Sequence, residues 1–217
     1  MDDAPMASPP VSRGAEASLR RVEWLGFPAL LKERDAKSYR PKALDERLRR
    51  ERTRTEARLL SDVRKLGVRT PIVYDVDLAK GRLVLEEIPG PTLKQLLDVH
   101  READPEILSV VRSFGEALGR LHAAGISHGD LTSSNVIVPD ERSAGPALID
   151  LSMGSKSAGI EELGIDLHLV EEDLKALHPA SAKLLAAFFE GYAVGNPAGA
   201  ADVRRRAQEI RGRVRYA

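Results

Sequence analysis

The sequence predicts an α+β chain of two lobes, a small first lobe with antiparallel strands and a larger, mainly helical second lobe. Three observations lead to this prediction. Up to residue 88, short apolar runs bounded by turn residues flank one long stretch of helical periodicity. Pro89-Gly90-Pro91 then breaks the chain, and beyond it apolar residues recur mostly at helical spacing. The length of 217 residues accommodates one domain or two small lobes.

The first lobe is expected to span residues 14–90 and to begin with a hairpin. Residues 1–13 contain three prolines and are predicted to form a disordered leader. Apolar clusters within residues 17–32 are separated by Gly26, which indicates an antiparallel hairpin. Lys32 follows an apolar run, so we expect it on a strand of this hairpin.

A long helix and a second strand pair complete the first lobe. Residues 44–66 carry apolar side chains at helical spacing, with Asp45 as an N-cap and Gly67 beyond the C-terminal end. Residues 72–77 and 83–88 flank a turn-like segment and are predicted to pair as strands.

The second lobe is expected to span residues 91–203, followed by a basic tail over residues 204–217. Thr92 and Asp104 are suitable caps for its first two helices. Two short strands and three further helices are predicted over residues 135–138, 147–151, 163–177, 179–194 and 199–211.

Composition excludes several classes of protein. Basic and acidic residues both number 33, so no net charge attracts nucleic acid or membrane to the whole chain. The lack of cysteine excludes disulfides, thiolate metal sites and a cysteine nucleophile. No apolar run approaches the about 20 residues of a membrane span, and no signal-peptide pattern opens the chain. We therefore expect a cytoplasmic protein that does not bind membranes.

The clearest chemical signal runs from His128 to Asp150. Asp130 and Asn135 lie five residues apart in one polar loop, and a predicted strand pair returns Asp150 to the same edge. Phosphoryl transfer from ATP needs a carboxylate that orients the attacking hydroxyl and oxygen ligands for Mg²⁺. The order and spacing match a kinase catalytic loop and its metal-binding aspartate. Asp130 is therefore the candidate catalytic residue, and Asn135 and Asp150 are the candidate magnesium ligands.

A kinase-like site also needs a lysine for the ATP phosphates and an acidic partner on a helix. Lys32 and Glu56 stand at suitable places for these roles. The segment before the Pro-Gly break would supply the hinge, where the carbonyl of Glu86 and the N–H of Ile88 can bond an adenine edge. These features together predict a minimal bilobal protein-kinase-like fold that binds ATP and Mg²⁺.

Each of these residues has a simpler explanation when taken alone. The catalytic loop could be an ordinary turn capped by Asn135, and Asp150 could merely end a strand. A lysine after an apolar strand and a glutamate in a basic helix are usually solvated surface residues. The ordered set favours the kinase interpretation over these alternatives.

Several short motifs, spread from Gly14 to the C-terminus, resemble those of one family. They are Gly14-Ala15-Glu16-Ala17, Lys37-Ser38-Tyr39-Arg40, Leu44-Asp45, Arg52-Thr53-Arg54-Thr55-Glu56-Ala57, Thr70-Pro71, Glu86-Glu87-Ile88-Pro89-Gly90, His128-Gly129-Asp130-Leu131-Thr132-Ser133-Ser134-Asn135, Gly164-Ile165-Asp166-Leu167 and His178-Pro179. In combination they resemble the small atypical Ser/Thr kinase subunit of the KEOPS complex, the PRPK-like family in its archaeal form.

This resemblance implies a function and a set of roles. The family serves threonylcarbamoyladenosine modification of tRNA beside the anticodon, together with a threonylcarbamoyl transferase subunit and other KEOPS subunits, and hydrolyses ATP when bound to its partner. By resemblance, Gly14 belongs to the phosphate loop, and Asp166 braces the catalytic loop with His128. Lys32, Glu56, Asp130, Asn135 and Asp150 keep the roles given above.

The sequence departs from a regulated protein kinase in ways that bear on mechanism. Gly129 replaces the arginine that reads a phosphorylated activation loop. Only 15 residues separate Asp150 from Asp166, which leaves little room for a peptide-docking segment. Gly14 is the one clear glycine of the phosphate loop. A loosely covered phosphate admits water, so we expect ATP hydrolysis to exceed transfer to a protein.

The net charge of zero hides two basic segments. Residues 32–65 hold 13 basic and 7 acidic residues, and residues 203–217 hold six arginines and one glutamate. Acidic neighbours at helical spacing indicate a solvated face for the first segment. The second has fewer acids and is predicted to contact RNA phosphates. Its candidate residues are Arg204, Arg205, Arg206, Arg211, Arg213 and Arg215.

Two other function classes stay open at this point. His-Gly-Asp-Leu followed by asparagine also resembles small-molecule kinases of the aminoglycoside or choline type, although the 65 residues after Ser152 leave little for their acceptor pocket. A noncatalytic scaffold that retains nucleotide is the other alternative.

Overall fold

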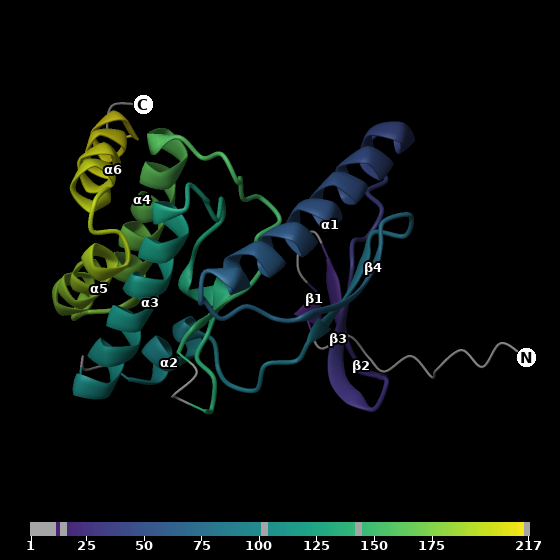
Figure 1. Ribbon diagram of the computed structural model, residues 1–217, viewed down its shortest axis with the longest axis horizontal. Helices are drawn as coiled ribbons and strands as arrows, with labels where there is room; N and C mark the ends of the chain where they lie inside the picture. The colour runs from purple at the N-terminus through teal and green to yellow at the C-terminus, as the bar shows by residue number, and fades with distance from the viewer. Residues whose placement is uncertain (1–11, 14–16, 101–103, 142–144, 215–217) are drawn as a thin grey trace, which may run out of the picture.

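The protein has a sheet at one end, a group of helices at the other, and helix α1 packed across the sheet (Figure 1). The computed structural model describes residues 12–13, 17–100, 104–141 and 145–214. This arrangement confirms the predicted α+β fold with a small antiparallel lobe and a helical lobe. The elements are β1 (Ser12–Arg13), β2 (Ser18–Trp24), β3 (Phe27–Glu33), α1 (Lys42–Lys65), β4 (Val73–Asp77), β5 (Arg82–Glu86), α2 (Leu93–Val99), α3 (Pro105–Ala123), the 3-10 turn η1 (Ser133–Asn135), β6 (Val136–Ile137), β7 (Ala147–Leu148), α4 (Ile160–Leu177), α5 (Ser181–Gly195) and α6 (Ala200–Val214).

The sheet of the first lobe has the strand order β1-β2-β3-β5-β4, with all neighbours antiparallel. The predicted hairpin is confirmed as β2 and β3, which are closed by Leu25 and Gly26 with φ of 51° and 83°. Two positive φ values are typical of the tight turn that matches strand twist. Lys32 lies on the central strand β3, opposite Leu83 of β5.

Two expectations for the first lobe are wrong in detail. Ser12 and Arg13 form strand β1 against β2, so the disordered leader predicted over residues 1–13 does not include them; residues 1–11 lie outside the described residues. Helix α1 begins at Lys42 after Pro41, so Asp45 is not its N-cap. Asp45 instead lies buried in the first turn, where its carboxylate suits the positive end of the helix dipole and pairs with Arg49.

The chain passes from β5 to α2 through the Pro-Gly-Pro segment, which is fixed to the second lobe. The N–H of Val138 donates to Pro91 O at 2.8 Å, and that of Asp140 donates to Pro89 O at 3.1 Å. Gly90 has a φ of 137°, and a Cβ there would lie 2.2 Å from Val138 O. Only glycine allows this close approach.

The helical lobe is built on tight packing between α3 and α5. A Cβ on Gly191 would lie 1.9 Å from Arg112 O, so the two backbones are nearly in contact. Thr92 and Asp104 cap α2 and α3 as predicted, each accepting a backbone N–H in the first turn. Strands β6 and β7 are shorter than predicted. Among the described residues, none of the helices combines the length and apolarity needed to cross a membrane.

Candidate active site

One cleft of about 1070 Å³ brings together the residues that the sequence assigned to phosphate, metal and catalysis. Strands β2, β3 and β5 and helix α1 line one side, and the catalytic loop and the segment after β7 line the other. The lining includes all of the following predicted residues: Lys32, Glu56, Glu86, Asp130, Asn135 and Asp150. Residues about 120 positions apart in sequence therefore face one space.

The centre of the cleft is an ion network around Lys32. Its ammonium donates to Glu56 Oε1 at 2.7 Å and lies 2.9 Å from Asp150 Oδ1. The side chains of Lys32 and Glu56 are 8% and 1% exposed, so water screens this pair weakly. Lys32 thus connects the two lobes through two carboxylates.

The same network shifts the pKa values of its carboxyl groups in opposite directions. Burial raises the pKa of Glu56, and this shift is opposed by Lys32 and Arg34 beside it. Burial would also raise the pKa of Asp150, but the Lys32 ammonium, together with a hydrogen bond from Ser152 and the charge of Arg34, holds that pKa below its usual value. Asp150 is therefore ionised at neutral pH, as a magnesium ligand must be.

Asp150 and Asn135 fit the requirements of a Mg²⁺ bound with nucleotide. Within the described residues, Asp150 Oδ1 is buried without a well-aligned hydrogen bond, and Asp150 has a φ of 57°. A strained backbone of this kind is common where a side chain is held for function. Asn135 donates its Nδ2 to Asp130 O at 2.8 Å, which leaves its amide oxygen for a metal. The described residues contain no group of three or more His, Asp and Glu that could hold a metal. The donor set thus suits Mg²⁺, which keeps phosphate and water ligands, rather than a metal held by protein alone.

His128 links the catalytic loop to the segment before Asp150. Burial lowers the pKa of His128, so its ring is neutral. Its Nε2 donates to Ile149 O at 2.9 Å, and its Nδ1 accepts the N–H of Asp130 at 3.4 Å. A neutral ring with the proton on Nε2 satisfies both contacts. His128 therefore connects the backbone of Asp130 to that of Ile149, the residue before Asp150; its supporting role stays a prediction.

Asp166 of α4 binds the backbone of the catalytic loop. It is fully buried and accepts the N–H of His128 at 2.6 Å and that of Gly129 at 2.8 Å. His122 of α3 donates to the same carboxylate at 3.2 Å and contacts the Tyr192 hydroxyl at 2.7 Å. Burial raises the pKa of Tyr192 to about 12, so this hydroxyl keeps its proton.

Close packing explains why position 129 is a glycine. Gly129 has a φ of 84°, and a Cβ would lie 2.2 Å from Met153 O. The segment after Asp150 packs directly on the catalytic loop, where Ser127 and Ser155 form a backbone bridge. An arginine that reads phosphate cannot occupy this position, because the space is filled by backbone.

Three expectations about the nucleotide site stay predictions. Glu86 lines the cleft; its carboxylate, which is not the group expected to bond adenine, pairs with Arg69 at 2.7 Å. Ile88 is buried and is not among the residues that line the cleft, so its adenine contact stays a prediction. Gly14 lies outside the described residues.

The predicted basic tail lies mostly within α6, which packs along α4 and continues to Val214, three residues beyond the predicted end of this helix. Its arginines are compensated by acids distant in sequence. Arg206 and Arg213 pair with Glu161 of α4, and Arg211 lies 3.6 Å from Glu171. Arg204 stacks 4.2 Å over the Phe189 ring, Arg205 pairs with Asp202, and Arg215 lies outside the described residues.

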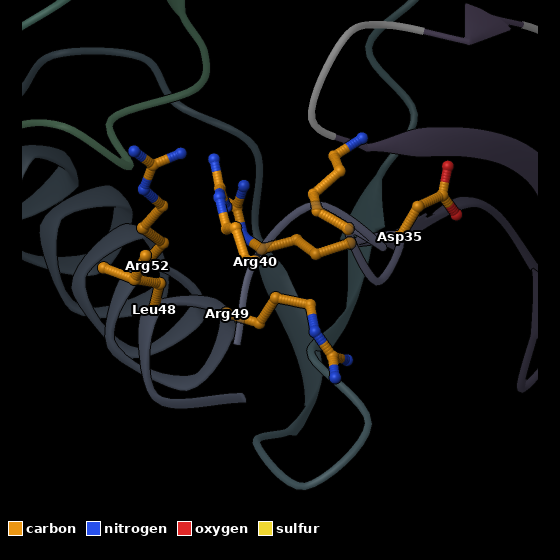
Figure 2. A pocket seen from close by; sticks show the side chains of 7 residues that line it. Asp35, Arg40, Leu48, Arg49 and Arg52 are labelled. Atoms are coloured by element: carbon orange, nitrogen blue, oxygen red, sulfur yellow. The ribbon is translucent and has the colours of Figure 1, made fainter. Parts of the chain in front are cut away.

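The other basic segment forms a small pocket between β3 and the start of α1. Figure 2 shows Arg40 and Arg52 extending to one side of it and Arg49 to the other. Asp45 lies 3.7 Å from Arg40 and 2.8 Å from Arg49. The pocket holds about 10 Å³, room for about one water molecule. Local ion pairs thus use part of this charge, as expected for a helix face.

Sequence reasoning missed residues that support the site. Arg34 is two positions after Lys32 and directly follows β3, so its side chain lies on the same side of the chain as Lys32, and its guanidinium donates to Glu56. Asp173 is two helical turns after Asp166 and accepts the N–H of Ser133 in the catalytic loop at 2.8 Å. These spacings of two and seven are visible in the sequence. The contact of His122 with Tyr192 joins residues 70 positions apart and leaves no local signal.

Comparison with known proteins supports the kinase-like interpretation of this geometry. Archaeal proteins with the name "Probable bifunctional tRNA threonylcarbamoyladenosine biosynthesis protein" are similar to nearly the whole chain. That of Methanothermobacter thermautotrophicus is 39% identical over 207 residues, and that of Methanoculleus marisnigri is 42% identical over 206 residues. Both alignments cover 95% of this chain but 36% of the relative, so the chain spans about a third of these proteins.

The family resemblance drawn from the motifs is confirmed by these matches. The family model of the RIO domain matches residues 27–159, from strand β3 to the residue before α4. This range holds Lys32, Glu56, Asp130, Asn135 and Asp150. The chain therefore belongs to the RIO domain family.

Proposed function

We propose that the protein is a Mg²⁺-dependent, ATP-using atypical Ser/Thr kinase with ATPase activity. The observation that carries this proposal is the contact of Lys32 with both Glu56 and Asp150 in the cleft that Asp130 and Asn135 also line. A lysine, two metal-ligand oxygens and a further carboxylate in one cleft are the parts that phosphoryl transfer needs.

Each residue then has one role. Lys32 binds the α and β phosphates, and Glu56 holds its ammonium in place. Asp150 and Asn135 would hold Mg²⁺, which neutralises charge on the phosphates when bound. Asp130 orients the attacking hydroxyl or water and accepts its proton, which contributes about 10²- to 10⁴-fold to such reactions.

Hydrolysis of ATP is the activity that we expect to dominate. The segment after Asp150 packs on the catalytic loop at Gly129, and α4 begins at Ile160. The segment between them therefore leaves little surface for a peptide near Asp130. Water meets no such restriction at an open cleft.

We further propose that this activity serves threonylcarbamoyladenosine modification of tRNA. The support is the printed name of the archaeal relatives, together with the motifs that resemble the KEOPS kinase subunit. The partners would be the threonylcarbamoyl transferase subunit, the other KEOPS subunits and tRNA, in the cytoplasm. Because the chain spans about a third of those relatives, partner binding is tested with separate proteins.

Replacing Asp130 with alanine tests the proposed activity. We expect kcat for Mg²⁺-dependent ATP turnover to fall by about a hundredfold or more, because the attacking group loses its proton acceptor. ATP turnover is measured alone, with the transferase partner, and with partner and tRNA. Asp140→Ala, at an exposed aspartate after β6, is the control and should match the wild type.

Three outcomes would contradict the proposal. Unchanged turnover in Asp130→Ala would favour a nucleotide-binding scaffold. Efficient phosphorylation of alcohols or aminosugars would favour a small-molecule kinase. Efficient peptide phosphorylation by the isolated chain would overturn the preference for hydrolysis.

Contact between α6 and tRNA gives a separate prediction. Arg205 and Arg213 have side chains 68% and 61% exposed, so their ion pairs with Asp202 and Glu161 are weak and open to exchange for phosphate. We expect Arg205→Ala/Arg213→Ala to weaken tRNA binding by about tenfold and to reduce the slope of log K against log salt by about two. Arg21→Ala, at an exposed arginine of β2, is the control. An unchanged salt slope would exclude this surface as an RNA contact.

A further inference from the structure

Arg34 is a buried cation in the cleft with no role in the mechanism above. It is 5% exposed and lies two residues after Lys32, directly after the end of strand β3. Its guanidinium donates to Oε2 of Glu56, while the Lys32 ammonium donates to Oε1. One carboxylate is thus held by two cations, one on β3 and one directly after it.

The charges around Glu56 show why a second cation matters. Lys32 contacts both Glu56 and Asp150, so one ammonium faces two carboxylates. With Arg34, this network has two cations, Lys32 and Arg34, for its two carboxylates. When Lys32 turns to a phosphate, Glu56 still has Arg34 as a partner. Without it, Glu56 would be a buried carboxylate that competes with the phosphates for Lys32.

The backbone and the helix around this contact are fixed independently of any ligand. The N–H of Arg34 donates to Gly81 O at 3.1 Å, which fixes the end of β3. Further along α1, Thr70 donates to Leu60 O at 2.8 Å and Arg64 donates to Thr70 O at 2.6 Å. Helix α1 is therefore bonded at Glu56 to the end of β3, and from one turn further on to Thr70, in the segment that leads to β4.

We propose that Arg34 is a positioning residue that holds Glu56 in place, so that Lys32 is presented to the phosphates before nucleotide binds. The catalytic ion pair is then already formed in the free protein and needs no phosphorylation. This inference rests on the proposed function for its catalytic consequence, but its structural part is a property of the nucleotide-free chain.

Hydrogen exchange of the free protein tests the structural part. Amides of α1 around Glu56 are expected to exchange about tenfold faster in Arg34→Gln than in the wild type, because the helix loses a buried ion pair. Arg34→Lys keeps the charge and should stay within about threefold. Arg82→Gln is the matched control, since it breaks an ion pair with Glu33 of the same sheet that is 37% and 23% exposed. An unchanged exchange rate in Arg34→Gln overturns the proposal.

Kinetics test the catalytic part. We expect kcat for ATP turnover to fall by about tenfold to a hundredfold in Arg34→Gln, with KM for ATP changed by less than about threefold, because positioning rather than binding is lost. Arg34→Lys should restore most of kcat. A wild type without Mg²⁺-dependent turnover would refute the proposed function and leave the exchange test valid.

A double variant separates action through Glu56 from direct contact with nucleotide. In the Glu56→Gln background, Arg34→Gln should change turnover by less than about twofold, since the carboxylate it holds is gone. If the double variant instead lost turnover by the product of the two separate fold-changes, the proposal would be overturned. If Arg34→Gln alone does not fold, the double variant is expected to fold because it leaves no unpaired buried charge. A double variant that also fails to fold contradicts the proposal.

Discussion

Asp150→Asn is expected to lower Mg²⁺-dependent ATP turnover by about a thousandfold, the largest loss of activity that the structure predicts. The substitution removes the carboxylate charge of Asp150, which Lys32 helps to keep ionised. The backbone of Asp150 has a left-handed conformation. Asparagine keeps the size of the side chain and is tolerated at this φ, so the fold is expected to remain. Steady-state turnover over a range of Mg²⁺ concentrations measures the effect.

The control for this prediction is Asp98→Asn, at an exposed carboxylate on α2. It should leave turnover unchanged. If Asp150→Asn lowered turnover by less than about tenfold at saturating Mg²⁺, Asp150 would not be a metal ligand.

Asp166→Ala is expected to reduce the free energy of unfolding by about 3–5 kcal/mol. Asp166 is fully buried and accepts hydrogen bonds from the backbone N–H groups of His128 and Gly129 and from His122. Alanine leaves these donors without an acceptor in a dry interior. Because this carboxylate binds two backbone N–H groups of the catalytic loop, ATP turnover should fall together with the free energy of unfolding. Urea unfolding measures the change.

A milder change in the same network provides the comparison. Tyr192→Phe removes one hydroxyl that contacts His122 at 2.7 Å, so it should reduce the unfolding free energy by about 1 kcal/mol. An effect of Asp166→Ala no larger than that of Tyr192→Phe would show that the loop is held by other contacts.

The site residues that the sequence predicted are those that short stretches of sequence are enough to identify. Asp130 and Asn135 lie in one loop and Asp150 follows a short strand pair, so their relative positions depend on few residues. Lys32 ends an apolar run on a strand and Glu56 lies in a long amphipathic helix, so the sequence pattern indicates both residues. The structure brings all five into one cleft.

The part that could not be predicted depends on tertiary packing. Arg34 looks like one more surface arginine in a basic segment until its burial against Glu56 is known. The start of α1 at Lys42 instead of Asp45 follows from Pro41 and from the partners that Asp45 finds in Lys37 and Arg49. The strong positive charge expected at the C-terminus is reduced by Glu161 and Glu171, acids 40 to 52 residues earlier in sequence than the arginines they pair with.

The central claim is that Lys32, Asn135 and Asp150 form one site for Mg²⁺ and nucleotide, with Asp130 beside it. A crystal structure of the protein with Mg²⁺ and a non-hydrolysable ATP analogue tests this most directly. We predict Mg²⁺ at about 2.0–2.1 Å from oxygens of Asn135 and Asp150, with the Lys32 ammonium on the phosphates and still bonded to Glu56. A nucleotide bound outside this cleft, or Mg²⁺ held without Asp150, would contradict the account.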